Sequence, residues 1–177
     1  TDLGHKMIAD LICNLLDTEY SYYKKLGAEK KPSLPEPFTA NRYEDAQRFQ
    51  NYSCSPVMEG FEPDTHGAAQ WSDPFKGGWT AHKQGSSIKF NVSGGIIMVQ
   101  YRKTINKPAP VAYAVIDGDR QNKVLLDANF DEDWGDLCCL EEIYSGAKGE
   151  HTAEIVIDTE GKENSDFMLI SVITANK

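Results

Sequence analysis

After residue 38 the pattern changes to short apolar segments separated by turn residues, and it is clearest from residue 87 onward. In residues 87–92, Ile88, Phe90 and Val92 alternate with polar residues, so these three side chains share one face of a strand. Further strands are expected at residues 96–101, 111–116, 123–127, 137–144, 151–158 and 166–174. Several short strands without intervening helices predict a mainly β fold, a jelly-roll-like antiparallel β-sandwich.

Two turn signals divide these strands. Ser93-Gly94-Gly95 predicts a turn between the strands at 87–92 and 96–101, and Asp117-Gly118 predicts a hairpin after the strand at 111–116. The segment 41–52 fits either an early strand or a short helix.

The first twenty residues follow a different pattern, because their apolar residues recur at helical spacing. One amphipathic helix is therefore expected before the sandwich. Its apolar stripe consists of Leu3, Met7, Ile8, Leu11, Ile12, Leu15 and Leu16. Exposure of seven such side chains to water would cost on the order of 10 kcal/mol as an upper bound, so the stripe needs a partner surface.

Residues 27–37, GAEKKPSLPEP, combine three prolines with a glycine and a charge cluster. This composition predicts a linker, and a long ordered loop lying on the sandwich is the alternative. The expected division is therefore a helix in residues 1–26, a linker in 27–37 and a β-sandwich in 38–177.

The composition excludes several classes of partner. The net charge of −9 disfavours binding to phosphate backbones and anionic membranes, whereas neutral sugars remain compatible with it. No apolar run approaches the roughly 20 residues of a membrane span. Four cysteines without a C-x-x-C spacing are read as structural thiols, and the compartment, secreted or cytoplasmic, stays open.

The opening segment TDLGHKMIADLICNLL resembles the last conserved block of SGNH/GDSL hydrolases, the part that follows the catalytic Asp-x-x-His-Pro element. The resemblance implies that residues 1–26 are the final helix of an esterase domain and that its catalytic Asp and His precede Thr1. In this pattern His5 is not the catalytic histidine, so a local structural role is expected for it. No G-x-S-x-G or G-D-S-L motif occurs, and we expect the chain alone to lack a catalytic site.

The β region resembles the jelly-roll accessory domains attached to such esterases. The segments that carry this likeness are Gly78-Trp79, GSSIKFNVSG, VAYAVIDGD and GEHTAEIVI. The resemblance implies a fold more firmly than an activity, because sandwiches support many functions.

Three tryptophans are candidate sugar contacts, because the C–H face of a pyranose ring stacks on flat aromatic groups. Trp134 is the strongest, since it lies in an acidic loop, whereas Trp71 and Trp79 flank DPFKGG and could instead close the core. Tyr101 ends an apolar strand and is expected in the core.

The loop DANFDEDWGD supplies clustered carboxylates, as a calcium site requires, but it lacks EF-hand spacing. The candidate ligands of a structural calcium ion are Asp127, Asp131, Asp133 and Asp136, and a solvated acidic loop is the alternative.

The sequence therefore predicts a non-catalytic, carbohydrate-binding-like accessory domain of an SGNH esterase that acts on acylated carbohydrate. The expected partners are an upstream SGNH domain and a polysaccharide or oligosaccharide. A packing or oligomerisation domain, with the helix pairing two copies, is the alternative.

Overall fold

The structure is a computed structural model that describes residues 2–25, 27, 39, 41–66, 73–159 and 163–176. The chain divides into two compact units, Thr1–Thr39 and Ala40–Lys177, and each is described by itself. The predicted linker, residues 27–37, lies outside the described residues except for Gly27.

The first unit contains one helix, α1 (Asp2–Lys25), as the apolar spacing predicts. Asp2 in the first turn and Lys24 and Lys25 in the last turn have the charges that favour the helix dipole. No residue of α1 is buried, so its apolar stripe is exposed among the described residues. No helix in the described ranges is long and apolar enough to cross a membrane.

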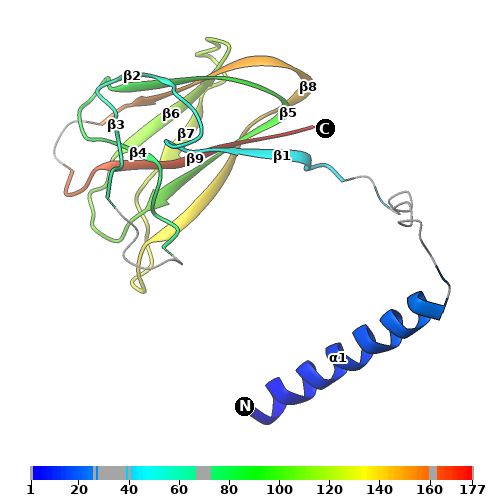
Figure 1. Cartoon of the computed structure of the whole chain (residues 1–177). Coiled ribbons are helices and arrows are strands. Elements are labelled where there is room, and N and C mark those ends of the chain that lie inside the picture. The colour runs from blue at the N-terminus through cyan, green and yellow to red at the C-terminus, as the bar shows by residue number, and fades with distance from the viewer. Residues whose placement is uncertain are drawn as a thin grey trace. The chain divides into compact units, whose positions relative to one another are not determined.

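The second unit is an antiparallel β-sandwich, so the predicted fold class is confirmed (Figure 1). Its strands are β1 (Glu44–Phe49), β2 (Val57–Glu59), β3 (Glu62–Pro63), β4 (Trp79–Ala81), β5 (Ser87–Lys103), β6 (Val111–Ile116), β7 (Val124–Asp127), β8 (Leu137–Ile157) and β9 (Phe167–Asn176). Of the two alternatives for residues 41–52, the structure selects the strand, because β1 pairs with the last strand, β9.

Two long strands, β5 and β8, pair along almost their whole length and take part in both layers of the sandwich. The second half of β5 pairs with β9, which also pairs with β1 and β4. The first half of β5 pairs with β2, and the second half of β8 pairs with β6, which continues to β7. These pairings place β2, β6 and β7 in one layer and β1, β4 and β9 in the other.

The core lies between these layers and draws on both. Ile88, Phe90 and Val92 point into it from the first half of β5, as the alternation predicts. Tyr101 is also buried there, stacked on Phe167 with ring centroids 5.8 Å apart, which confirms its predicted core position.

The turn predicted at Ser93-Gly94-Gly95 is wrong, because β5 continues through it as one strand of 17 residues. Likewise the segments at 137–144 and 151–158 are parts of the single strand β8. The register of β5 against β8 shifts between Gly94 and Ile96, as at a β-bulge. A Cβ on Gly94 would lie 3.1 Å from the Ala175 carbonyl oxygen, so the glycine permits close strand packing at the bulge rather than a reversal.

The turn predicted at Asp117-Gly118 is confirmed. Both residues have positive φ, 50° and 77°, as a type I′ turn requires, and the Asp119 amide donates to the Ile116 carbonyl at 2.9 Å. The turn connects β6 to the segment that leads into β7, and this segment forms one wall of a pocket described below.

Candidate functional site

Trp134 lies on an exposed loop between β7 and β8, with 64% of its surface accessible. Its ring meets the Phe130 ring edge-to-face, with centroids 5.1 Å apart and planes at 87°. The loop is anchored at both ends, because the Phe130 amide donates to the Thr104 carbonyl and the Ile105 amide donates to Asp136. Trp134 therefore presents a solvent-exposed aromatic surface on an anchored loop, the kind of surface on which sugar rings stack.

The other two tryptophans differ. Trp79 is 1% exposed in the core, edge-to-face with Phe90 at 5.1 Å, so it cannot contact a ligand. Of the two roles that the sequence left open for Trp79, core packing is correct. Trp71 lies outside the described residues.

The four aspartates proposed as calcium ligands do not converge. Asp127 accepts two hydrogen bonds from Asn129, and Asp136 accepts the Ile105 amide and lies 3.8 Å from Arg102. Asp131 pairs with Lys107, whose hydrogen bond and charge lower the pKa of its carboxyl group.

Asp133 is exposed, and no cluster of three potential metal-ligating residues occurs in the described part of the chain. In the described residues these carboxylates bind neighbouring amides and cations one by one, and the calcium site stays a prediction of the sequence.

Each histidine of the sandwich pairs with an aspartate. His151 Nδ1 lies 2.8 Å from Asp117 Oδ2, and its ring centroid lies 4.3 Å from that of Tyr144. The Thr152 amide also donates to Asp117, and these hydrogen bonds lower the pKa of the Asp117 carboxyl group. His151 thus anchors the turn at Asp117-Gly118 to β8. His66 and His82 lie beside Asp64 and Asp166 respectively, at 3.1 Å.

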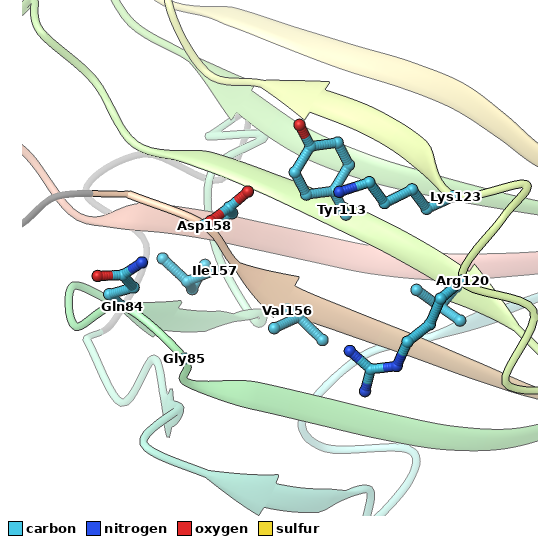
Figure 2. Close-up of a pocket in the computed structure, with 9 residues that line it drawn as sticks. Gln84, Gly85, Tyr113, Arg120, Lys123, Val156, Ile157 and Asp158 are labelled. Atoms are coloured by element: carbon cyan, nitrogen blue, oxygen red, sulfur yellow. The ribbon is translucent and has the colours of Figure 1, made fainter.

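A pocket of about 330 Å³ opens on the outer face of the layer formed by β5, β8 and β6. Figure 2 shows Gln84 and Asp158 at one end and Arg120 at the other, with Val156 between them. Tyr113 and Lys123 form one side wall. The pocket is thus an apolar floor with polar groups at its ends, the usual plan of a small-molecule site.

The strand register builds this floor. Tyr113 on β6 pairs with Val156 on β8, which pairs with Ser87 on β5. Val115 pairs with Glu154 in the next row. Side chains two residues apart on a strand share a face, so Tyr113 and Val115 both lie on the outer face of the sheet. The alternate residues, Ala112 and Ala114, point into the core.

The charges around the pocket are partly paired. Glu154 lies 3.6 Å from Lys89 and 3.9 Å from Arg120, which are ion-pair distances longer than a good hydrogen bond. The Lys123 ammonium group lies 3.5 Å from the centroid of the Tyr113 ring, in cation–π contact. Among the described residues, Glu154 is the carboxylate that pairs with Arg120, and at 3.9 Å this contact leaves guanidinium N–H groups available to an acceptor in the pocket.

Sequence reasoning missed this pocket, because its walls come from residues 84–85, 113–123 and 156–158. The available signal was that Tyr113, Val115 and Val156 are apolar at outward positions of strands whose other face supplies the core. An antiparallel sheet normally shows polar residues on its solvated face.

The sandwich fold and the exposed aromatic loop resemble those of carbohydrate-binding domains. Domains of this class occur linked to esterases. The chain is similar over 99% of its length to a two-domain esterase (CEX) active on acetylated mannans. The identities are 41% in the crystal structure with mannopentaose and 40% in that of the esterase alone, with TM-scores of 0.78 and 0.80. The expected resemblance to an esterase-linked sandwich is thereby confirmed.

The chain spans about half of that esterase, 47% and 48% of the two crystallised chains. A family two carbohydrate esterase from Cellvibrio japonicus matches 75% of this chain and 34% of its own, at 12% identity and a TM-score of 0.54. At this identity the likeness extends to the fold only. Neither the models of protein families nor the curated proteins give a match.

Proposed function

We propose that the sandwich is a glycan-binding module of a two-domain esterase that removes acetyl groups from a mannan-like polysaccharide. The observation that carries this proposal is the 41% identity to an esterase active on acetylated mannans, sustained over 99% of the chain. The exposed Trp134 and the neutral-sugar compatibility of an acidic surface support it.

The remainder of the protein would contain the SGNH catalytic domain, with a serine nucleophile, a histidine base and an oxyanion hole. The apolar stripe of α1 supports the assignment of this helix to that domain, since a stripe of seven large side chains needs a surface to cover it. A module that holds the polysaccharide raises the concentration of acetyl esters near the serine.

Trp134 is the proposed stacking platform of the module. Its ring is exposed, its loop is fixed by backbone hydrogen bonds, and Phe130 supports it from the side. Stacking on such a ring contributes about 0.5–1.5 kcal/mol beyond area burial, which corresponds to a two- to tenfold change in affinity.

The alternative, a packing or oligomerisation domain without a ligand, is not favoured, since the similar esterase acts on polysaccharide and no finding supports oligomerisation through α1.

Affinity electrophoresis of the 177-residue chain in gels that contain acetylated mannan, deacetylated mannan or xylan tests the proposal. We expect retardation by mannan and a several-fold weaker interaction for Trp134→Ala. Tyr43→Ala removes another exposed aromatic side chain and should leave retardation unchanged. Unchanged mobility of the wild-type chain in every gel would overturn the glycan-binding role.

A p-nitrophenyl acetate assay separates the module from the enzyme. The chain alone should hydrolyse this ester at the background rate, whereas the two-domain protein should hydrolyse it faster. Hydrolysis by the chain alone would contradict the assignment of the catalytic residues to the rest of the protein.

A further inference from the structure

The pocket between Gln84 and Arg120 has an apolar floor where a solvated sheet face is expected. Val115 on this outer face is 3% exposed, so its side chain is covered. Val156, diagonally across from it on β8, is half-buried and keeps part of its surface open to the pocket. The floor can therefore take an apolar group of a ligand on Val156 without rearrangement of the sheet.

The size of the pocket fits a single sugar unit. Its volume of about 330 Å³ lies at the small end of the range of about 300–1,000 Å³ that is typical of ligand sites. Trp134, in contrast, presents an open aromatic surface that can follow a chain of sugars. The pocket is thus suited to one residue of a glycan and the group attached to it.

Ring stacking is not what this pocket offers. One face of Tyr113 is occupied, because the Lys123 ammonium group lies 3.5 Å from the ring centroid. A pyranose ring that stacked there would have to displace the ammonium group. The apolar surface that remains open is the side chain of Val156, which suits a methyl group better than a sugar face.

The polar groups at the two ends differ in character. Arg120 supplies donors only, because a guanidinium group has no acceptor, and its nearest carboxylate, on Glu154, is 3.9 Å away. Asp158 and Gln84 lie at the other end (Figure 2). The Asp158 carboxylate accepts hydrogen bonds, and the Gln84 side-chain amide can both donate and accept them. A carbonyl oxygen matches the Arg120 end, and hydroxyl groups match the Asp158 end.

An acetyl ester joins a methyl group to a carbonyl oxygen that accepts hydrogen bonds and donates none. A free hydroxyl group placed on Val156 would lose its water contacts without a new partner, which disfavours the unsubstituted sugar. We propose that this pocket binds an acetylated hexose unit, with the methyl group on Val156 and the ester carbonyl accepting from Arg120. The proposal rests on the proposed glycan-binding function and adds that the module recognises the esterase's substrate over its product.

An NMR titration of the ¹⁵N-labelled 177-residue chain tests the acetyl pocket. The ligands are an acetylated manno-oligosaccharide and the same oligosaccharide after alkaline deacetylation. The acetylated form should bind about tenfold or more tightly, the discrimination that one small apolar group commonly gives. Shifts specific to the acetylated form should map to the amides of Tyr113, Val156 and Ile157. Val156→Thr keeps the side-chain shape but adds a hydroxyl group, and Arg120→Gln removes the charge from an exposed position.

Each variant should reduce the acetyl preference to about threefold or less while the affinity for the deacetylated form is kept. Val57→Thr, at an exposed strand position outside the pocket, is the matched control and should keep the preference. Equal affinities of the wild-type chain for both oligosaccharides, or shifts confined to the Trp134 loop, would overturn the acetyl pocket while glycan binding stands. Absence of binding to either form would overturn the glycan-binding function as well.

Discussion

Lys123 holds its ammonium nitrogen 3.5 Å from the centre of the Tyr113 ring, on the outer face of the sandwich. The contact joins the segment after the Asp117-Gly118 turn to β6 and forms one wall of the pocket. It therefore connects the stability of this wall with the surface that the pocket offers to a ligand.

Replacement of Lys123 by Met keeps most of the side-chain volume and removes the cation–π contact. We expect the free energy of unfolding to fall by about 0.5–1 kcal/mol, the value of such a contact at an exposed site. Urea denaturation measures the change. Lys83→Met, at another exposed lysine, is the control, and equal effects of the two substitutions would contradict the assigned contribution.

Substitution by alanine should affect stability much more at Trp79 than at Trp134. Trp79→Ala removes a fully buried ring and leaves a cavity beside Phe90, so a loss of about 3–5 kcal/mol is expected. Trp134→Ala removes an exposed ring and should change stability by less than about 0.5 kcal/mol. Thermal and urea unfolding compare them, and a marginal effect at Trp79 would refute its place in the core.

Gly78 should not tolerate a side chain. A Cβ at this position would lie 2.0 Å from the Leu169 carbonyl oxygen and 2.8 Å from the Ile170 Cα, and both obstacles are backbone atoms. Gly78→Ala should therefore cost more than about 2 kcal/mol through forced movement of β9.

Gly149→Ala is the matched control, because its Cβ would meet only the His151 ring at 3.6 Å. Alanine in a strand is favoured over glycine by about 0.5–1 kcal/mol, so this variant should be neutral or slightly stabilised. Similar losses at both glycines would contradict the tight approach at Gly78. Urea unfolding of the two variants makes the comparison.

The pair formed by Asp117 and His151 should make stability depend on pH under acid conditions. Hydrogen bonds from His151 and Thr152 lower the pKa of Asp117 below its ordinary value of 3.8, so folding favours the carboxylate. This contribution is complete above pH 3.8 and is lost as the pH falls through the lowered pKa of the folded state.

Asp117→Asn should remove that contribution, so the stability difference from the wild type should be largest above pH 4 and shrink as the pH falls to about 2. Urea unfolding across this range measures it. Glu132→Gln, at an exposed residue of the acidic loop, serves as the control for the loss of one carboxylate. A difference that stays constant with pH would reject the linkage.

The sandwich should fold without α1, since the buried apolar core residues of the described ranges all lie between Phe61 and Ala175. We expect a chain of residues 40–177 to unfold within about 0.5 kcal/mol of the 177-residue chain, as independent units do. It should also aggregate less, because the apolar stripe is gone. If removal of α1 lowered the free energy of unfolding by more than about 1 kcal/mol, α1 would stabilise the sandwich.

Local patterns predicted the elements that depend on local physics. The apolar stripe predicted α1, and the type I′ turn at Asp117-Gly118 follows from the ease with which these residues adopt positive φ. The same reasoning failed at Ser93-Gly94-Gly95, where turn-forming residues lie inside β5. Pairing with β8 and β9 on its two sides outweighed the local preference for a turn there.

The sequence ranked Trp134 first as a sugar contact, but it left two roles open for Trp79 and for the four aspartates. Only the exposed fraction of each side chain shows that Trp79 is a core ring and that Trp134 faces solvent. The carboxylates of the acidic loop are close in sequence, but in the structure they bind different partners, namely Asn129, Lys107 and Arg102.

By itself, the sequence determined that one amphipathic helix precedes an antiparallel sandwich, because hydrophobic period and turn chemistry are properties of neighbouring residues. Only the tertiary structure decided which outward side chains meet. The pocket joins residues 84–85, 113–123 and 156–158, and their contact depends on the register of β5, β8 and β6. That register is fixed by the burial of the opposite face of the same strands, so the core sets the geometry of a surface that it never touches.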